Sequence, residues 1–410
     1  MITLARNRSY RLLFSATAIS NLGDGVSALA LPWLATLITR DPTLIALVAF
    51  ATRLPWFLLA IPAGAFVDRG DRRRLIVQAD VVRIVLTAGI IALIFAVPDF
   101  PPGQSETIYI LALSTLAFLL GTAEVLRDNA AQTLLPSIVA KQDLETANGQ
   151  LWSVEQVMGS FVGPPLAGVL IALAVPAPFL LDAVTFALAA WLVWAIALPP
   201  RVKPAKRALW TEIGEGWLWI RDHPMVLRVA IILGLLNGAA FMALTVLVLF
   251  SQEILNLSAF GHGILLTAGA AGGVVGGLLG PRIVARFGAV NSVRIALVIF
   301  PIPYLVIAQT ASPLLVGIAL FFEMLAGLTW NIVTVSWRQR IIPDDILGRV
   351  NSIYRFFGWG LMPFGALLGG LIVNLAEPEL GRELALRTPY FAASAICVLL
   401  ALFGWRSIRI

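Results

Sequence analysis

Charged residues and cysteine are scarce in this 410-residue chain, and each scarcity excludes a type of structure. Only 13% of the residues are charged, whereas soluble domains carry about 25%. The hydrophobic fraction is 59%, above the roughly 45–50% of soluble domains. The single cysteine, Cys397, excludes an internal disulfide. The composition therefore predicts a membrane protein and excludes an ordinary soluble domain.

Residues that mark catalytic or metal centres are also few. His223 and His262 are the only histidines, and they lie in different loops. No glycine loop is followed by the Lys and Ser/Thr that bind phosphate, so ATP is not expected to drive the protein directly. We expect no enzyme activity, no cofactor and no metal site. The net charge of +6 is explained by basic loops at one membrane face rather than by nucleic acid.

Long apolar runs dominate what is present, and each is long enough to cross a bilayer, which needs about 20 residues. The fold class that they predict is an all-α membrane protein with twelve transmembrane helices in two six-helix bundles. The expected spans are 12–38, 43–67, 74–97, 107–127, 147–174 and 176–198, then 225–251, 260–284, 289–308, 311–334, 349–375 and 388–407.

Basic residues alternate with the spans, which predicts the orientation of the chain. With twelve spans, one side receives Arg8, Arg72, Lys141, Lys203, Arg286, Arg338 and Arg406 with their basic neighbours. The opposite loops hold mostly acids, such as Asp99, Glu253 and Glu377, with Arg382 and Arg387 as exceptions. We therefore expect a multi-pass protein of the inner (plasma) membrane with both termini in the cytoplasm.

The two halves share features that indicate an internal repeat. Asn148 opens span five and Asn351 opens span eleven, and each is preceded by a loop with a proline and acids. Two six-span bundles rocking about a midplane site are what alternating access needs. We expect bundles at 1–198 and 224–410. Between them, 199–223 is predicted to be a cytoplasmic amphipathic linker lying on the inner surface.

The loop after span two carries a recognisable motif. Gly64, Asp68, Arg69, Arg72 and Arg73 resemble the signature loop of the major facilitator superfamily, and the resemblance covers essentially the whole chain. Phe66 replaces the usual leucine, and Asp71 stands where a second glycine is usual.

The resemblance implies a gate at the inner mouth. Asp68 would cap the positive start of span eleven, while Arg72 would pair with acids such as Asp128. The alternative is a solvated basic turn that only sets topology.

Span five carries a second motif. Gly159, Gly163, Pro164 and Gly168 resemble the antiporter motif of drug–proton exchangers in the superfamily. Small residues allow helices to approach closely, and a proline allows a bend. The functional interpretation is a hinge that prevents proton leak, and the alternative is ordinary tight packing. The stretches 208–224 and 337–354 resemble the branch that contains siderophore and macrolide exporters.

Carboxyl groups inside spans are the candidates for proton coupling, because buried charges are costly and usually functional. Glu323, Glu155 and Asp24 are the candidates. The alternative is a permanently protonated acid that bonds a neighbouring helix. Asp80 and Arg83, three residues apart, are expected to neutralise each other, and Arg53 is expected to pair with Asp24.

The predicted substrate cavity is mostly apolar and aromatic. Such a lining suits bulky amphipathic ligands, including cations that lie over rings. Tryptophans near span ends can equally be interfacial anchors. The candidate residues are Asn21, Trp33, Arg53, Phe57, Trp152, Asn237, Phe241, Trp330, Asn331, Arg355 and Trp359.

These features predict a secondary active transporter that exports amphipathic small molecules, drugs or siderophore-like compounds, in exchange for protons. Its partners would be the small-molecule substrate, protons and membrane lipids, with no nucleic acid, and the resemblance implies a monomer. One alternative is an uncoupled facilitator or a lysophospholipid-type lipid transporter. Another is a membrane receptor or assembly partner that does not transport.

Overall fold

The computed structural model describes residues 7–59, 62–63, 67, 70–97, 99–198, 209–343 and 346–408, and every regular element among them is helical. Ten segments of this described chain are long and apolar enough to cross a membrane. The last of them, Leu347–Ser407, is 61 residues long and holds both of the final predicted spans. The first predicted span lies in a further helix, Arg8–Ile38. The predicted all-helical membrane fold is confirmed.

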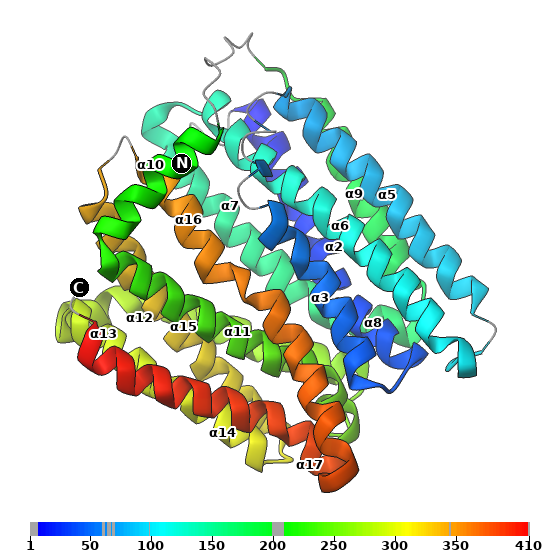
Figure 1. The fold of residues 1–410 in the computed structure, drawn as a ribbon. Coiled ribbons are helices and arrows are strands. Elements are labelled where there is room, and N and C mark those ends of the chain that lie inside the picture. The colour runs from blue at the N-terminus through cyan, green and yellow to red at the C-terminus, as the bar shows by residue number, and fades with distance from the viewer. Residues whose placement is uncertain are drawn as a thin grey trace. The chain divides into compact units, whose positions relative to one another are not determined.

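The helices follow the predicted spans to within a few residues at most ends (Figure 1). Their bounds are α2 (Arg8–Ile38), α3 (Pro42–Leu59), α5 (Arg72–Ala96), α6 (Glu106–Leu134), α7 (Leu144–Gln156), a π-helical turn (Val157–Val162), α8 (Gly163–Leu173) and α9 (Ala177–Trp194). After them come α10 (Leu209–Asp222), α11 (Pro224–Glu253), α12 (Ala259–Phe287), α13 (Ala289–Ile299), α14 (Pro301–Gln309), α15 (Pro313–Ile341), α16 (Leu347–Gly360) and α17 (Met362–Ser407).

Local sequence explains where several helices begin. The Asn7 side chain accepts a hydrogen bond from the Tyr10 N–H at 3.1 Å, and Asp71 accepts one from Arg74 N–H at 3.1 Å. Each therefore satisfies a backbone donor that the first helical turn leaves unpaired. Within α17 the helical path breaks at Gly381, whose φ of 74° favours glycine. This break separates the two spans that α17 contains.

The chain forms two compact units. Unit 1 comprises Met1–Thr39, Leu54–Lys206 and Ala259–Gly263. Within it α2 packs against α8 and α9, and α5 packs against α6 and α9 (Figure 1). A cluster of buried apolar side chains, including Tyr10, Leu13, Ile76 and Leu134, joins one end of these helices.

Unit 2 comprises Arg40–Arg53, Arg207–Ser258 and Ile264–Ile410. Its most extensive packing joins α11 to α17, where the Gly365 backbone lies directly against the Gly238 backbone. The amphipathic helix α10 packs on α16: Glu215 forms an ion pair with Arg349, and the Trp217 and Phe357 rings stack with centroids 6.1 Å apart. The linker residues 199–208 lie outside the described residues.

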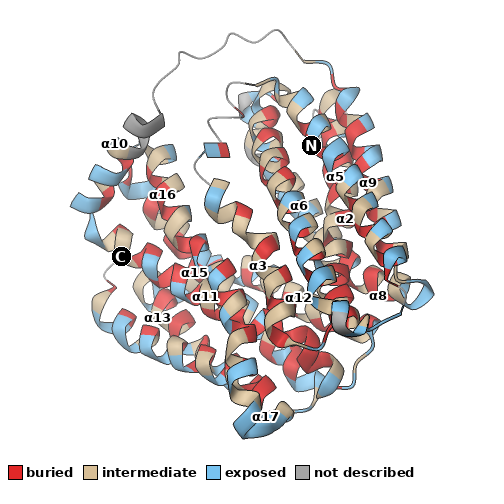
Figure 2. Cartoon of the chain, turned by 45° about the vertical axis from the view of Figure 1, so that its right-hand side comes forward, coloured by how far each residue is buried: buried red, intermediate tan, exposed pale blue. Residues whose placement is uncertain are grey.

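Exposed residues recur along the helices of both units (Figure 2), and many of them are large and apolar. Phe95 is 74% exposed, Leu173 75% and Leu375 79%. A soluble protein rarely exposes such continuous apolar area, and a helix satisfies all of its backbone polar groups when lipid surrounds it. Exposed apolar side chains such as these three are suited to contact with lipid.

Candidate functional site

Unit 1 contains a chain of charges that links three helices. Arg83 of α5 forms an ion pair with Asp24 of α2, and its Nη1 lies 3.5 Å from an oxygen of Asp80 on the same helix. The same Asp80 oxygen lies 3.5 Å from Nε of Arg127 on α6. Nη1 of Arg127 lies 3.2 Å from Asp128. We call these five residues the charge cluster.

Burial differs strongly along the charge cluster. The Asp80 side chain is 0% exposed, and those of Arg83 and Arg127 are 3% and 4% exposed. Asp24 and Asp128, at the two ends, are 26% and 31% exposed. The cluster therefore has an enclosed centre, and its two terminal carboxylates reach open space.

The charge cluster carries more carboxylates than cations. Three carboxylates face two guanidinium groups. Buried charges are tolerated only when they are paired, so one proton shared among the three carboxylates would balance the group. The described cluster therefore carries one more negative group than positive groups.

Helix α9 closes one side of the charge cluster. The Arg83 guanidinium lies 3.6 Å from the centroid of the Phe186 ring, a cation–π contact. One turn before Phe186, the buried Asp182 accepts a hydrogen bond from the Ser27 hydroxyl of α2. Asp182 thus adds a further carboxyl group near Asp24 and Arg83, although it forms no ion pair among the described residues.

Two expected ion pairs are wrong. Asp24 pairs with Arg83, whereas Arg53 lies over the Phe241 ring at 5.4 Å. Asp24 belongs to unit 1 and Arg53 belongs to unit 2, so the nearness of their spans in the sequence could not give the pairing. Asp128 pairs with Arg127 rather than with Arg72, because the adjacent guanidinium on the same helix reaches it first.

The arginines of the predicted gating loop contact carbonyl groups of unit 1. Arg72 donates hydrogen bonds to the Thr133 carbonyl and to the Ser137 hydroxyl. Arg73 donates to the Ile196 carbonyl at 3.0 Å. Gly64, Asp68 and Arg69, the remaining residues of the predicted gate in this loop, lie outside the described residues. The expected cap by Asp68 on span eleven stays a prediction.

The other two proton-coupling candidates lie in different surroundings. Glu155 of α7 is exposed, near the π-helical turn. Glu323 of α15 accepts a hydrogen bond from the Tyr304 hydroxyl of α14 at 2.9 Å. This bond ties Glu323 to a neighbouring helix, the contact expected of a structural carboxyl group.

The glycines of the antiporter-like motif lie at close helix contacts within unit 1. A Cβ on Gly163 would meet the backbone of Gly25 on α2, and Gly25 in turn faces Gly159. Further along, Gly168 lies against the backbone of Phe260, and the Pro164 carbonyl lies against Gly263. The motif therefore packs two partners, α2 and the first turn of α12.

Two pairs of the predicted cavity residues are in contact within unit 2. Arg355 and Trp359 of α16 form a cation–π pair at 5.0 Å, and Arg53 lies over Phe241. The Asn237 side chain donates to the Gly358 carbonyl at 2.7 Å and so joins α11 to α16. Asn331 is exposed.

Other predicted cavity residues are scattered. Trp330 is only 1% exposed, so protein covers it in this structure. In unit 1 the Asn21 side chain donates to the Thr17 carbonyl, and the Trp33 ring lies 6.1 Å from that of His262. Trp152 is 50% exposed. The structure thus supports individual pairs rather than one lining formed by the whole set.

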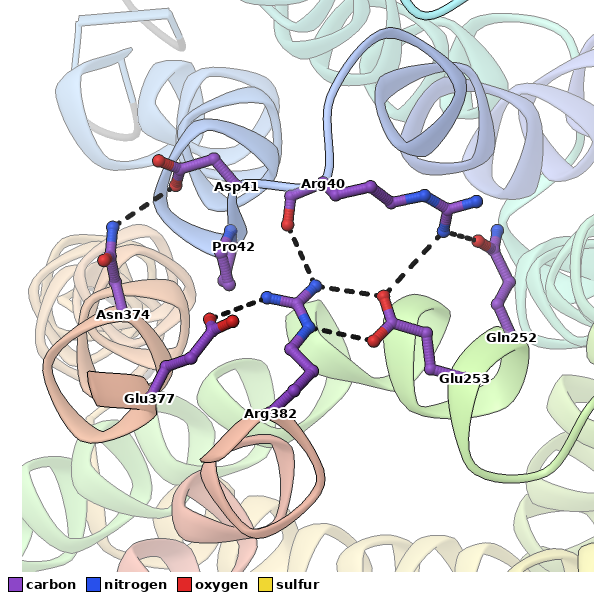
Figure 3. Close-up of a pocket in the computed structure, with 8 residues that line it drawn as sticks. All are labelled: Arg40, Asp41, Pro42, Gln252, Glu253, Asn374, Glu377 and Arg382. Atoms are coloured by element: carbon purple, nitrogen blue, oxygen red, sulfur yellow. Dashed lines mark hydrogen bonds and ion pairs between the residues drawn. The ribbon is translucent and has the colours of Figure 1, made fainter. Parts of the chain in front are cut away.

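A polar pocket of about 600 Å³ opens in unit 2 between the residues before α3, the end of α11 and the middle of α17 (Figure 3). Arg382 lies at its centre and donates to Glu253, Glu377 and the Arg40 carbonyl. Asn374 donates to the Thr43 hydroxyl at 3.0 Å. The lining is Arg40, Asp41, Pro42, Gln252, Glu253, Asn374, Glu377 and Arg382.

Sequence reasoning missed this pocket and the link from Asp80 to Arg127. In the sequence, Arg382 stands out only as a basic residue on the side where acids predominate. An arginine among acids is itself a signal of ion pairing, and Arg382 pairs with Glu253 and Glu377. Asp80, Arg83 and Arg127 are each visible as charges inside spans, but Asp80 was expected to pair only with Arg83 of its own helix, and the partner of Asp24 was sought on the wrong span. The signal available was that adjacent spans carry opposite charges at similar depth.

Comparisons with known proteins identify a family and a fold. Residues 3–406 match the family described as transmembrane secretion effector. The multidrug efflux pump Tap of Mycobacterium tuberculosis is 26% identical over 394 residues, covering 90% of this chain and 88% of Tap. The staphyloferrin A transporter of Staphylococcus aureus is 23% identical, covering 89% of each chain. A crystal structure of a bacterial homologue of the iron transporter ferroportin superposes with a TM-score of 0.73 at 17% identity, covering 96% of this chain and 98% of that one, which shows a shared fold.

Proposed function

We propose that this chain, which belongs to the transmembrane secretion effector family of the major facilitator superfamily, exports amphipathic small molecules in exchange for protons. Membership of the family makes it a multi-pass membrane transporter. Export, the kind of substrate and the coupling to protons are the proposed part.

One observation carries the proton coupling: the charge cluster holds three carboxylates against two guanidinium groups inside a membrane bundle. We assign the carrier role to Asp24. Its carboxylate is partly exposed and ends the cluster, so it can meet water while Arg83 keeps it in place. The groups that face it are Ser20 and Arg83, and Asp80, Arg127, Asp128, Glu155 and Asp182 also lie within electrostatic reach. Glu155 and Glu323 remain as the alternative carriers.

Coupling requires that binding of a proton favours one conformation of the transporter over another. Protonation of Asp24 would remove the negative partner of Arg83. The guanidinium would then depend on Asp80 and the Phe186 ring alone. The position of α2 relative to α5 would thereby respond to the bound proton, and this response is the coupling that we propose.

The direction of transport and the substrate class are supported by the relatives. Tap is named as a multidrug efflux pump, and the Staphylococcus aureus relative as a staphyloferrin A transporter. Exposed aromatic residues such as Trp152 and Trp359 suit a bulky amphipathic ligand. Both termini are proposed to be cytoplasmic, since basic residues favour that side, and the protein is proposed to act as a monomer.

The test is proton movement in sealed liposomes that contain the purified full-length protein. A pH-sensitive dye inside the vesicles would report proton flux while macrolides, siderophores and lipophilic cations are added outside. We expect at least one compound to drive proton flux in the wild type. Asp24→Asn should lose that flux while retaining exchange of the radiolabelled compound down its own gradient.

Glu323→Gln serves as the matched control, because it neutralises another carboxyl group within a span. It should keep proton flux near the wild-type rate. Loss of flux in Glu323→Gln, with normal flux in Asp24→Asn, would transfer the carrier role to Glu323. Exchange that ignores the pH gradient in the wild type would overturn coupling and favour an uncoupled facilitator.

A further inference from the structure

Several arginines of unit 2 lie over aromatic rings and form no ion pair among the described residues, and three of them are Arg53, Arg338 and Arg355. The distance from the guanidinium carbon to the ring centroid is 5.4 Å for Arg53 over Phe241, 3.5 Å for Arg338 over Tyr354 and 5.0 Å for Arg355 over Trp359. None of these arginines forms an ion pair within the described part of the chain. Arginines in membrane spans are normally paired, because an isolated charge is costly there.

Arg338 and Arg355 are joined through one face of α16. Nη1 of Arg338 donates to the Asn351 side chain at 2.9 Å, and its Nε donates to the Thr334 carbonyl. Asn351, Arg355 and Trp359 follow one another at intervals of four residues, so they lie on one face of the helix. Arg338 is 7% exposed, whereas Arg355 is exposed. The buried Arg338 therefore holds Asn351 on the face of α16 where the Arg355 side chain is exposed.

The Arg355 side chain is exposed and lies against the residue one turn further along its helix. Its guanidinium carbon is 5.0 Å from the centroid of the Trp359 ring. Within the described part of the chain this ring is the contact that balances the guanidinium, and no carboxylate lies within ion-pair distance. Arg355 is therefore an exposed cation that can accept an anionic partner.

The aromatic rings on this face are already covered by the chain's own cations. The electron-rich faces of Phe241, Tyr354 and Trp359 contact Arg53, Arg338 and Arg355. The contact from Asn237 to Gly358 places the helix turn that precedes Phe241 beside the residue that precedes Trp359. A ligand cation would meet guanidinium groups here instead of free rings. This differs from the expectation that these rings receive cationic ligands.

We infer that the exposed guanidinium of Arg355 binds an anionic group, a carboxylate or a phosphate, on the amphipathic molecule that unit 2 accepts. Trp359 packs the apolar part next to that group and holds the guanidinium plane. Arg338 raises the positive charge behind the site and fixes Asn351. The inference rests on the proposed transport function and names the class of its substrate. A planar guanidinium can bind either anion with two parallel hydrogen bonds.

Binding can be tested without transport or protons, so its failure is distinct from failure of antiport. The full-length protein would be placed in nanodiscs of neutral phosphatidylcholine and titrated calorimetrically with decyl phosphate, decanoate and decyltrimethylammonium. We expect the two anions to bind and the cation of equal chain length to bind at least tenfold more weakly. Equal affinity for the cation would overturn the inference.

Variants assign the effect to Arg355. Arg355→Gln should weaken decyl phosphate binding at least tenfold, and Arg355→Lys should be intermediate because it keeps the charge but loses the planar pair of donors. Arg294→Gln is the matched control, since Arg294 lies over the Trp405 ring at 5.1 Å near helix ends. It should bind as the wild type does. Unchanged binding in a folded Arg355→Gln protein would also overturn the inference.

The anionic group could belong to a soluble amphiphile or to a phospholipid, and a second series separates the two. Phosphatidylglycerol would replace part of the phosphatidylcholine in the discs. If decyl phosphate affinity stays constant, the ligand is a soluble amphiphile. If it falls in the wild type but not in Arg355→Gln, the site takes a lipid headgroup. A fall of equal size in both proteins would remove Arg355 from the site.

Discussion

The guanidinium of Arg382 binds both carboxylate oxygens of Glu253, with Nε 2.8 Å from Oε2 and Nη2 2.9 Å from Oε1. It also donates to Glu377 and to the Arg40 carbonyl (Figure 3). Arg382 follows Gly381, where α17 changes direction. One side chain thus holds three separate parts of unit 2: the residues before α3, the end of α11 and the break in α17.

Replacement of Arg382 should destabilise unit 2. Arg382→Gln leaves Glu253 and Glu377 without their shared cation, and we expect a loss of about 1–3 kcal/mol because the pair is only partly buried. Arg382→Lys should recover part of it, since lysine keeps the charge but not the bidentate geometry. Thermal unfolding in detergent measures the effect. Arg282→Gln is the control, because Arg282 is exposed and donates to a carbonyl of its own helix. Equal melting temperatures for both variants would contradict the assignment.

The two ends of the charge cluster should tolerate changes that its centre does not. Asp80→Asn leaves the buried guanidinium groups of Arg83 and Arg127 without the carboxylate between them. The expected cost is about 1–3 kcal/mol, the loss when buried donors lose an acceptor, because Arg83 keeps Asp24 and Arg127 keeps Asp128. Asp24→Asn should cost less, because Asp24 is partly exposed. Yield of folded protein and melting temperature give the order, and the reverse order would refute it.

Close packing of α2 against α8 can be tested with single methyl groups. Gly163→Ala places a Cβ against the Gly25 backbone, and backbone cannot move aside as a side chain does. We expect overpacking to cost about 1–3 kcal/mol and to lower transport. Gly149→Ala, on a helix position with open space, should instead be neutral or gain up to about 1 kcal/mol. We expect the melting temperature of Gly163→Ala to fall below that of the wild type and that of Gly149→Ala to stay equal or rise.

The bond from Tyr304 to Glu323 should matter for stability rather than for coupling. Tyr304→Phe removes the only described donor to Glu323, and the expected loss is about 0.5–1.5 kcal/mol. Proton flux per molecule of folded protein should be unchanged. A Tyr304→Phe protein with normal melting temperature but altered flux would place Glu323 in the coupling machinery.

Apolar length was enough to locate helices but not to pair charges. Span seven was expected at 225–251 and α11 runs from Pro224 to Glu253, because about 20 apolar residues in sequence leave few choices in a bilayer. Asp24 illustrates the opposite case. Its partner could have been Arg53 or Arg83, and only tertiary packing, which brings α5 against the other helices of unit 1, decides for Arg83.

The same limit applies to the aromatic residues. The sequence placed Trp330 and Trp359 together among cavity candidates, yet one is enclosed and the other is exposed at 36%. Helical periodicity gives the relative directions of residues on one helix, but it does not say which direction faces a neighbour. The spacing of four residues already indicates that Arg355 and Trp359 can form a cation–π pair. The sequence does not indicate that Arg355 forms no ion pair with a carboxylate among the described residues.

The π-helical turn Val157–Val162 introduces a phase shift into span five. A π turn holds one residue more than an α turn, and one residue corresponds to a rotation of about 100° around the helix. Gly163 and Gly168 face their partners only with that surplus residue in place. Deletion of one residue, such as Ser160, would restore regular pitch and turn the whole far half of the span away from α2. Apart from Gly159, which faces Gly25, this turn should therefore tolerate a change of residue type better than any change in its length.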